Sequence, residues 1–213
     1  MSSTPQLTLE TFLENLSART PTPGGGSASA LGGALGAALA HMAGVFTTAN
    51  EKYKSIEPQV LKLLDGFTAL RKHFVELIQK DIDAYAAYSK ARALPKNSPE
   101  EKKARSAAIA AANEIATAVP EQIVDTGLRG FELLEALGAI VNPNLAGDVA
   151  VAAYFLEAAV RGAAIQVVSN CAQPDTEGVN ARRRRGVAEK IARCQAARER
   201  LDLAMLKLLK VEC

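Results

Sequence analysis

The chain has 213 residues, enough for one domain with a sizeable buried core. Hydrophobic residues make up 48% and charged residues 23%, a balance that argues against a disordered chain. The formal net charge is +2, aromatic residues make up 5% and tryptophan is absent, so neither an electrostatic attraction to nucleic acid nor a base-stacking surface is indicated. We therefore expect no nucleic-acid partner, and any ligand must be recognised by local groups.

The first half of the chain is predicted to be helical. Apolar spacing predicts a short helix over residues 9–16, followed by a proline- and glycine-rich break at 20–26. An uncharged alanine- and glycine-rich helix then runs to about residue 50. A long helix begins near residue 57 and carries one apolar stripe as far as residue 88.

The uncharged segment 27–49 is long enough to cross a membrane. Its side chains are mostly those of alanine and glycine rather than leucine and phenylalanine, and no lysine or arginine directly flanks its start. Small residues at helical spacing permit close approach of neighbouring helices. We expect a buried helix here and no membrane association.

Helix boundaries are equally readable in the second half. Ser98, Pro99 and Glu101 form a capping-box pattern that starts a helix, and Gly138 ends it. Pro120 predicts a break or kink within that helix.

Two further helices complete the chain, at about 145–170 and toward the C-terminus. Alternating Val/Ile/Thr-rich runs with hairpin turns are absent from the sequence, so we expect no sheet. The fold prediction is all-α, a single-domain bundle of long helices spanning residues 1–213. Alanine-rich helices bury little area each, which favours self-association, most simply as a homodimer.

The cysteine and histidine content argues against disulfide bonds and a metal site. Cys171, Cys194 and Cys213 are too few and too widely spaced for a disulfide framework or a CxxC unit. Only two histidines are present, and neither lies in an HExxH pattern, so we expect no metal site. The start of the chain also lacks the basic residues of a secretory signal. Together these features predict a cytoplasmic location.

Asp81 is the most informative charged residue. It falls in the apolar stripe of the long helix with Ile78 and Tyr85, whereas Asp83 lies on the opposite, charged side. A carboxylate in an apolar stripe must be paired, protonated or functional. The structural alternative for Asp81 is a buried ion pair with Arg161 or Arg105.

The glycine run Gly24-Gly25-Gly26 followed by Ser27 opens a helix, where free amides and the helix dipole can receive an anion. It matches neither the dinucleotide-binding fingerprint nor the phosphate loop. Taken alone, the run favours a flexible turn with Ser27 near the cap.

Three other charged features have ordinary explanations when each is taken alone. Asp148 lies in the first turn of a helix, where it complements the dipole with Asn144 as cap. Lys52 follows the end of a helix, where a cation is favoured. The run of four arginines at 182–185 is explained better by a solvated helix start than by a nucleic-acid patch, because acidic residues follow it.

The order of these motifs is more specific than any one of them. It resembles the cyclodeaminase/cyclohydrolase family of tetrahydrofolate enzymes over nearly the whole chain. The motifs that carry the resemblance are Pro21-Thr22-Pro23-Gly24-Gly25-Gly26-Ser27, Lys52-Tyr53, Asp81 with Asp83-Ala84-Tyr85, Leu94-Pro95-Lys96, Glu100-Glu101-Lys102 with Ala104-Arg105, Asn142-Pro143-Asn144 with Asp148, and Arg161-Gly162-Ala163-Ala164.

The resemblance implies an all-helical homodimer that acts on a one-carbon tetrahydrofolate substrate, with no permanently bound cofactor and no metal. The leading activity is hydrolysis of 5,10-methenyltetrahydrofolate to 10-formyltetrahydrofolate. One alternative is cyclodeamination of formimidoyltetrahydrofolate with release of ammonia. Another is a folate-binding or interaction module that keeps the fold without turnover.

The same resemblance implies the site residues. The catalytic group comprises Asp81, Lys52, Asp148 and Tyr85, and the substrate-binding group comprises Pro23, Gly24, Gly25, Gly26, Ser27, Lys96, Asn142 and Asn144. The chain also departs from the family pattern. Asn50 and Glu51 replace lysines that commonly precede the tyrosine, and Gln166 and Val168 stand where the family commonly has Asn and Arg.

Overall fold

The computed structural model describes residues 8–172 and 178–210. These residues form six α-helices and two 3-10 helices, with no β-strand among them, which confirms the all-α prediction. The elements are α1 (Leu9–Ser17), α2 (Gly25–Thr48), η2 (Glu51–Ile56), α3 (Glu57–Arg92), α4 (Pro99–Gly138), η3 (Pro143–Leu145), α5 (Ala146–Asn170) and α6 (Val179–Leu208).

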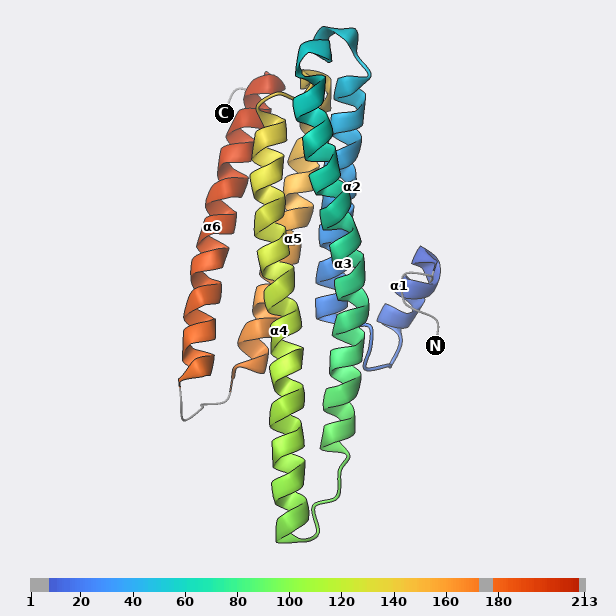
Figure 1. Ribbon diagram of the computed structural model, residues 1–213, viewed down its shortest axis with the longest axis vertical. Coiled ribbons are helices and arrows are strands. Elements are labelled where there is room, and N and C mark those ends of the chain that lie inside the picture. Colours follow the sequence, from blue (N-terminus) through green and yellow to red (C-terminus); the bar gives the residue numbers. More distant parts are fainter. Residues whose placement is uncertain (1–7, 173–177, 211–213) are drawn as a thin grey trace.

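The long helices lie side by side in an elongated bundle, with α1 standing to one side (Figure 1). Helix α2 packs against α3 and α5, α4 packs against α3 and α5, and α6 covers α4 and α5. The last two turns of α3 and about the first third of α4 project beyond the other helices as a two-helix arm (Figure 1). We define the arm as residues 85–112, which lie between Asp81, bonded to α2, and Asn113, bonded to the end of α5. The bundle therefore has a packed body and an exposed arm.

Small residues on α2 allow the closest helix contacts. A Cβ on Gly33 would lie 2.4 Å from the Phe74 ring, and a Cβ on Gly36 would lie 3.0 Å from the carbonyl oxygen of Ala152. The bulky apolar residues that fill the core come mainly from α3, α4 and α5. Helix α2 is thus a thin helix that α3 and α5 approach closely on its inner side.

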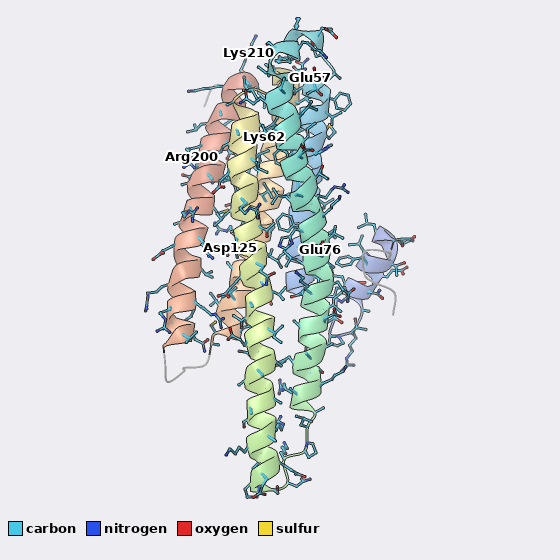
Figure 2. All side chains as sticks on the ribbon, viewed as in Figure 1. Glu57, Lys62, Glu76, Asp125, Arg200 and Lys210 are labelled. Carbon is cyan, nitrogen blue, oxygen red and sulfur yellow. The ribbon has the colours of Figure 1, made fainter. Side chains whose placement is uncertain are left out.

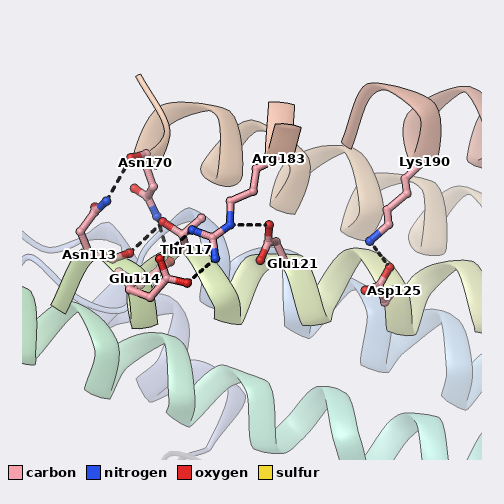
Figure 3. Close-up of polar contacts among 9 residues, drawn as sticks. Asn113, Glu114, Thr117, Glu121, Asp125, Asn170, Arg183 and Lys190 are labelled. Atoms are coloured by element: carbon pink, nitrogen blue, oxygen red, sulfur yellow. Dashed lines mark hydrogen bonds and ion pairs between the residues drawn. The ribbon is translucent and has the colours of Figure 1, made fainter. Parts of the chain in front are cut away.

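Helix α4 continues through Pro120, so the expected break there is wrong. Proline has no amide hydrogen, which leaves the carbonyl of Ala116 without its partner four residues later. The side-chain amide of Asn170, at the end of α5, donates to that carbonyl at 2.9 Å, and the Asn113 side chain donates to the Asn170 carbonyl at 3.2 Å (Figure 3). A residue from another helix therefore supplies the missing hydrogen bond.

Charged pairs join α4 to α6. Arg183 binds Glu114 and lies 3.1 Å from Glu121, while Lys190 lies 2.5 Å from Asp125 (Figure 3). Farther along, Arg200 of α6 lies 2.7 Å from Glu135 of α4. Figure 2 labels Asp125 on α4 and Arg200 on α6. Contrary to the expected solvated helix start, Arg183 is engaged between helices.

Helix α2 and the stretch Pro143–Asn170 are each long and apolar enough to cross a membrane. In this fold about half of each is buried inside the bundle, as in the core helices of a folded domain. Their outer sides adjoin and expose large apolar side chains. We call this strip the α2–α5 face; its exposed members are Leu35, Phe46, Val151, Phe155 and Ile165.

Candidate active site

The start of α2 meets the middle of α3 at Asp81. The Asp81 carboxylate oxygen Oδ2 accepts two hydrogen bonds, from the Ser27 amide at 2.8 Å and from the Ser27 hydroxyl at 2.7 Å. Since the first amides of a helix lack partners within that helix, Asp81 caps α2 from a neighbouring helix. The ion pairs considered for Asp81 do not form: Arg161 pairs with Glu157, and Arg105 binds the Arg92 carbonyl.

The glycine run is explained by the close approach of other helices. A Cβ on Gly26 would lie 2.1 Å from Asp81 Oδ1, and a Cβ on Gly25 would lie 2.7 Å from the Gln166 side-chain nitrogen. Gly24 has extended backbone angles and precedes the first turn of α2. The run therefore allows a carboxylate from α3 and an amide from α5 to reach the helix start.

The environment of Asp81 perturbs its acidity. Burial raises the pKa of the Asp81 carboxyl above its ordinary value, although the two hydrogen bonds from Ser27 oppose that effect. Because Oδ2 accepts both bonds, Oδ1 is the oxygen directed toward Gly26. A carboxyl group with a raised pKa, one of whose oxygens accepts no hydrogen bond from Ser27, is a candidate for acid/base chemistry.

The stripe predicted on α3 is confirmed. Tyr85 lies one turn beyond Asp81 and pairs with Tyr88, with ring centroids 6.5 Å apart. Asp83, on the other side of the helix, is exposed and accepts a hydrogen bond from Gln79 at 2.8 Å. The two neighbouring carboxylates therefore have different surroundings, as their spacing indicates.

Gln166 belongs to this part of the molecule, although the sequence identified it only as a departure from a family pattern. Its side chain lies against Gly25, and this contact brings α5 into the site. Val168, two residues later, is exposed. The only signal in the sequence was the departure itself. The contact with Gly25 then makes Gln166 a candidate for substrate contact.

The remaining predicted residues of the body lie at the other end of α2. The Asn142 amide donates to the Thr47 hydroxyl at 3.1 Å, which ties the Asn142-Pro143-Asn144 loop to the last turn of α2. Asp148 lies in the first turn of α5, directly after this loop, and Lys52 is exposed on η2. Lys52, Asp148, Asn142 and Asn144 thus form a second group.

Twenty residues of helix separate Ser27 from Thr47, which corresponds to about 30 Å. A single chain therefore does not bring Lys52 or Asp148 to Asp81. Lys96 is also distant: it is exposed in the connection between α3 and α4, at the tip of the arm. Gly26 and Ser27 do lie beside Asp81, and Pro23, Gly24 and Gly25 directly precede them in the chain.

Within the described residues, no three His, Cys, Asp or Glu side chains are arranged to hold a metal ion. Cys171 and Cys194 are buried and unbonded, and burial raises the pKa of the Cys194 thiol to about 12. A thiol with that pKa is protonated at neutral pH and is a poor nucleophile. The third cysteine, Cys213, lies outside the described residues.

Comparison with known proteins points to one group. Residues 8–189 match the family model described as formiminotransferase-cyclodeaminase. The chain is 35% identical over 194 residues to a methenyltetrahydrofolate cyclohydrolase of Methylorubrum extorquens, covering 91% of this chain and 93% of that one. It is 32% identical over 191 residues to the formimidoyltransferase-cyclodeaminase of Sus scrofa, covering 89% of this chain but only 35% of the pig protein.

A solved structure gives the same result. The formiminotetrahydrofolate cyclodeaminase of Thermotoga maritima superposes with a TM-score of 0.78 at 27% identity, covering 97% of both chains. The fold and the capped carboxylate define an all-helical bundle with a partly buried carboxylate bound at the start of a helix. The chain belongs to the formiminotransferase-cyclodeaminase family.

Proposed function

We propose that the protein hydrolyses 5,10-methenyltetrahydrofolate to 10-formyltetrahydrofolate. The observation that carries this proposal is the desolvated Asp81 carboxylate, held by Ser27 at the start of α2 with its pKa raised. The relative named for this activity supports the proposal because it matches over nearly the full length of both chains.

The reaction needs a positioned base. In the substrate a single carbon bridges N5 and N10 as a delocalised cation. A carboxylate that only paired with this cation would stabilise the ground state, because the positive charge disappears when water adds. Asp81 instead takes a proton from the attacking water as the water oxygen bonds to the bridging carbon.

The second half of the reaction needs an acid. A proton is delivered to N5 as its bond to the carbon breaks, from Asp81 or from a lysine ammonium. The remaining hydroxyl proton leaves as the formyl carbonyl forms on N10, so one proton is released overall. Lys52 can also donate a hydrogen bond to the developing oxygen.

Formimidoyltetrahydrofolate cyclodeamination is the second candidate, supported by the name of the Thermotoga maritima structure. That reaction forms the same bridged cation as N10 attacks the formimidoyl carbon and ammonia leaves. It requires a base for N10 and an acid for the departing nitrogen, so one carboxylate site serves both reactions.

Two assays on the purified protein separate the candidates. Loss of the methenyl absorbance above the spontaneous rate, absent in Asp81→Asn, is the expected result. Ammonia release from 5-formimidoyltetrahydrofolate without methenyl hydrolysis would replace the first proposal with the second. Tight folate binding with neither reaction would indicate a binding module.

We further propose that the protein acts as a homodimer through the α2–α5 face. Residues 20–50 contain no Lys, Arg, Asp or Glu, so this helix presents no like charges to a second copy of itself. A strip two helices wide and as long as α2 has an area on the order of 700 Å² per subunit, close to that of a standard stable interface.

An antiparallel arrangement of the two copies accounts for the separated groups. A two-fold axis perpendicular to the middle of α2 places the Lys52 end of one subunit opposite the Asp81 end of the other. Each dimer then has two sites, each containing Asp81, Tyr85 and Ser27 from one subunit and Lys52 and Asp148 from its partner. In this arrangement Asp81 and Lys52 of different subunits meet, although about 30 Å of α2 separates them within a single chain.

The cysteines support a cytoplasmic location for this reaction. Cys171 and Cys194 are buried as free thiols in the described residues. Unpaired buried thiols are typical of proteins that fold and remain in a reducing compartment.

A further inference from the structure

The stripe that contains Asp81 continues along the arm. Residues 81, 85, 88 and 92 are spaced by four, three and four positions, which places Asp81, Tyr85, Tyr88 and Arg92 on one face of α3. Direct contacts confirm the alignment: the Tyr85 and Tyr88 rings lie 6.5 Å apart, and the Arg92 guanidinium carbon lies 6.0 Å from the centre of the Tyr88 ring.

This face is open where it leaves the body of the bundle. The arm extends beyond the ends of α2, α5 and α6 (Figure 1), and Tyr85 is 44% exposed. Arg92 is also exposed, and among the described residues its guanidinium forms no ion pair, only the contact with Tyr88. Along this face, the partly buried Asp81 carboxylate is therefore followed by the rings of Tyr85 and Tyr88 and then by the Arg92 guanidinium.

The position of Arg92 is well fixed. The Arg105 side chain from α4 donates two hydrogen bonds to the Arg92 backbone carbonyl, at 3.1 and 3.0 Å, which ties the end of α3 to α4. Side chains on a helix lean toward its N-terminus, which carries the guanidinium back over Tyr88 and toward Asp81. The cation is thus directed along the stripe.

We propose that this stripe binds the p-aminobenzoyl-glutamate half of the folate substrate, an inference that rests on the proposed function. A tetrahydrofolate presents its one-carbon group, an aromatic ring and a glutamate dianion in that order. The stripe presents a carboxylate, two aromatic rings and a guanidinium in the same order. The rings of Tyr85 and Tyr88 stack on the p-aminobenzoyl ring, and Arg92 binds a glutamate carboxylate.

The alternative is a structural role, in which the ring and guanidinium contacts only stabilise the arm. The test uses substrate with and without its glutamate. In Arg92→Gln, we expect KM for 5,10-methenyltetrahydrofolate to rise about tenfold or more with kcat nearly unchanged, because a charge-assisted contact to the substrate tail is lost. KM for the same compound lacking glutamate, 5,10-methenyltetrahydropteroate, should be equal in wild type and variant.

Matched variants complete the test. Lys90→Gln removes an equally exposed cation from the opposite face of α3 and should leave both KM values unchanged. Tyr88→Leu should raise KM for both compounds, since both contain the aromatic ring. An Arg92→Gln enzyme with a wild-type KM for the glutamate-bearing substrate overturns the inference while the proposed function stands.

A binding measurement distinguishes failure of the inference from failure of the function. By titration calorimetry, wild type should bind the stable analogue 5-formyltetrahydrofolate more tightly than its form lacking glutamate, and Arg92→Gln should lose that difference. If wild type binds neither compound and hydrolyses no folate, the proposed function is wrong and the subsite assignment falls with it. Equal affinity of wild type for the two compounds overturns the subsite assignment alone.

Discussion

The two ends of α2 carry residues of one predicted site in different surroundings. At the first end, Asp81 is desolvated and held by two bonds from Ser27, with Gly26 leaving room for its other oxygen. At the second end, Lys52 is exposed, and the amides of Lys52 and Asn144 bond to the side chains of Asn50 and Asn142 within local turns. The first end holds a fixed, partly buried carboxylate within one chain, whereas the second end is an exposed tip that the proposed dimer would place opposite the first end of its partner.

The largest expected effect comes from removing the base at the first end. Asp81→Asn keeps the size of the side chain and an acceptor for Ser27, but it cannot take a proton. We expect turnover to fall by about two to four powers of ten with a smaller change in substrate binding. Asp83→Asn, on the exposed side of α3, is the matched control and should be nearly silent in the same kinetic assay.

The raised pKa of Asp81 gives this prediction a pH dependence. Between the ordinary aspartate pKa and the raised one, the folded protein holds more protons than the unfolded chain, so stability falls as pH rises through that window. Asp81→Asn should therefore be as stable as wild type or more stable at neutral pH, and wild-type kcat/KM should decline on the acid side. A variant that is destabilised but keeps its specific activity would make Asp81 only a cap.

The next effect tests the close approach at the start of α2. In Gly26→Ala the new Cβ would overlap Asp81 Oδ1 at 2.1 Å, so the carboxylate must move off Ser27. We expect activity to fall by about 10- to 100-fold. Gly25→Ala should cost less, because the flexible Gln166 side chain can yield. Gly186→Ala, where a Cβ meets no atom within 4 Å, should leave activity unchanged.

A charge on the α2–α5 face should dissociate the proposed dimer and so separate the Lys52 end of one subunit from the Asp81 end of the other. Phe46→Glu places a carboxylate in the proposed interface, and we expect it to shift the protein to monomer and lower activity about tenfold or more. Sedimentation at micromolar concentration and the turnover assay measure the two effects together. Leu203→Glu, at a 61% exposed position on α6, is the control. A monomeric wild-type protein with full activity would contradict the dimer proposal.

The smallest effect lies outside the site. Asn170→Ala leaves the Ala116 carbonyl without a donor, which should cost about 1 kcal/mol in the free energy of unfolding with no change in turnover. In a Pro120→Ala background the backbone amide is restored and can bond to that carbonyl. The Asn170→Ala cost should then shrink, as a double-mutant cycle by chemical denaturation would measure. An equal cost in both backgrounds would refute the compensation.

Local signals made most of the fold predictable. The capping box at Ser98, the end of α4 at Gly138 and the α3 stripe depend on residues a few positions apart, and all appear in the structure. The break predicted as one effect of Pro120 does not occur, because Asn170, 50 residues later, bonds to the carbonyl that the proline leaves free. The contacts of the candidate site likewise join residues that are far apart in the sequence.

The stripe predicted that Asp81 was unusual, but its partner Ser27 lies 54 residues earlier in the chain. The contact of Gln166 with Gly25 likewise depends on how α5 packs against α2. The distance of Lys52 from the helix start, in contrast, follows from the sequence. More than twenty residues of uninterrupted helix before Lys52 already place that lysine about 30 Å from the helix start.

The most direct test of the shared site is complementation between two inactive variants. Asp81→Asn and Lys52→Met subunits are produced together with different tags, and dimers that carry both tags are purified. Each such hybrid contains one site with both substitutions and one with neither, so the account predicts about half of wild-type activity although each variant alone is inactive. Hybrid dimers as inactive as their parents would show that Asp81 and Lys52 do not meet across the interface.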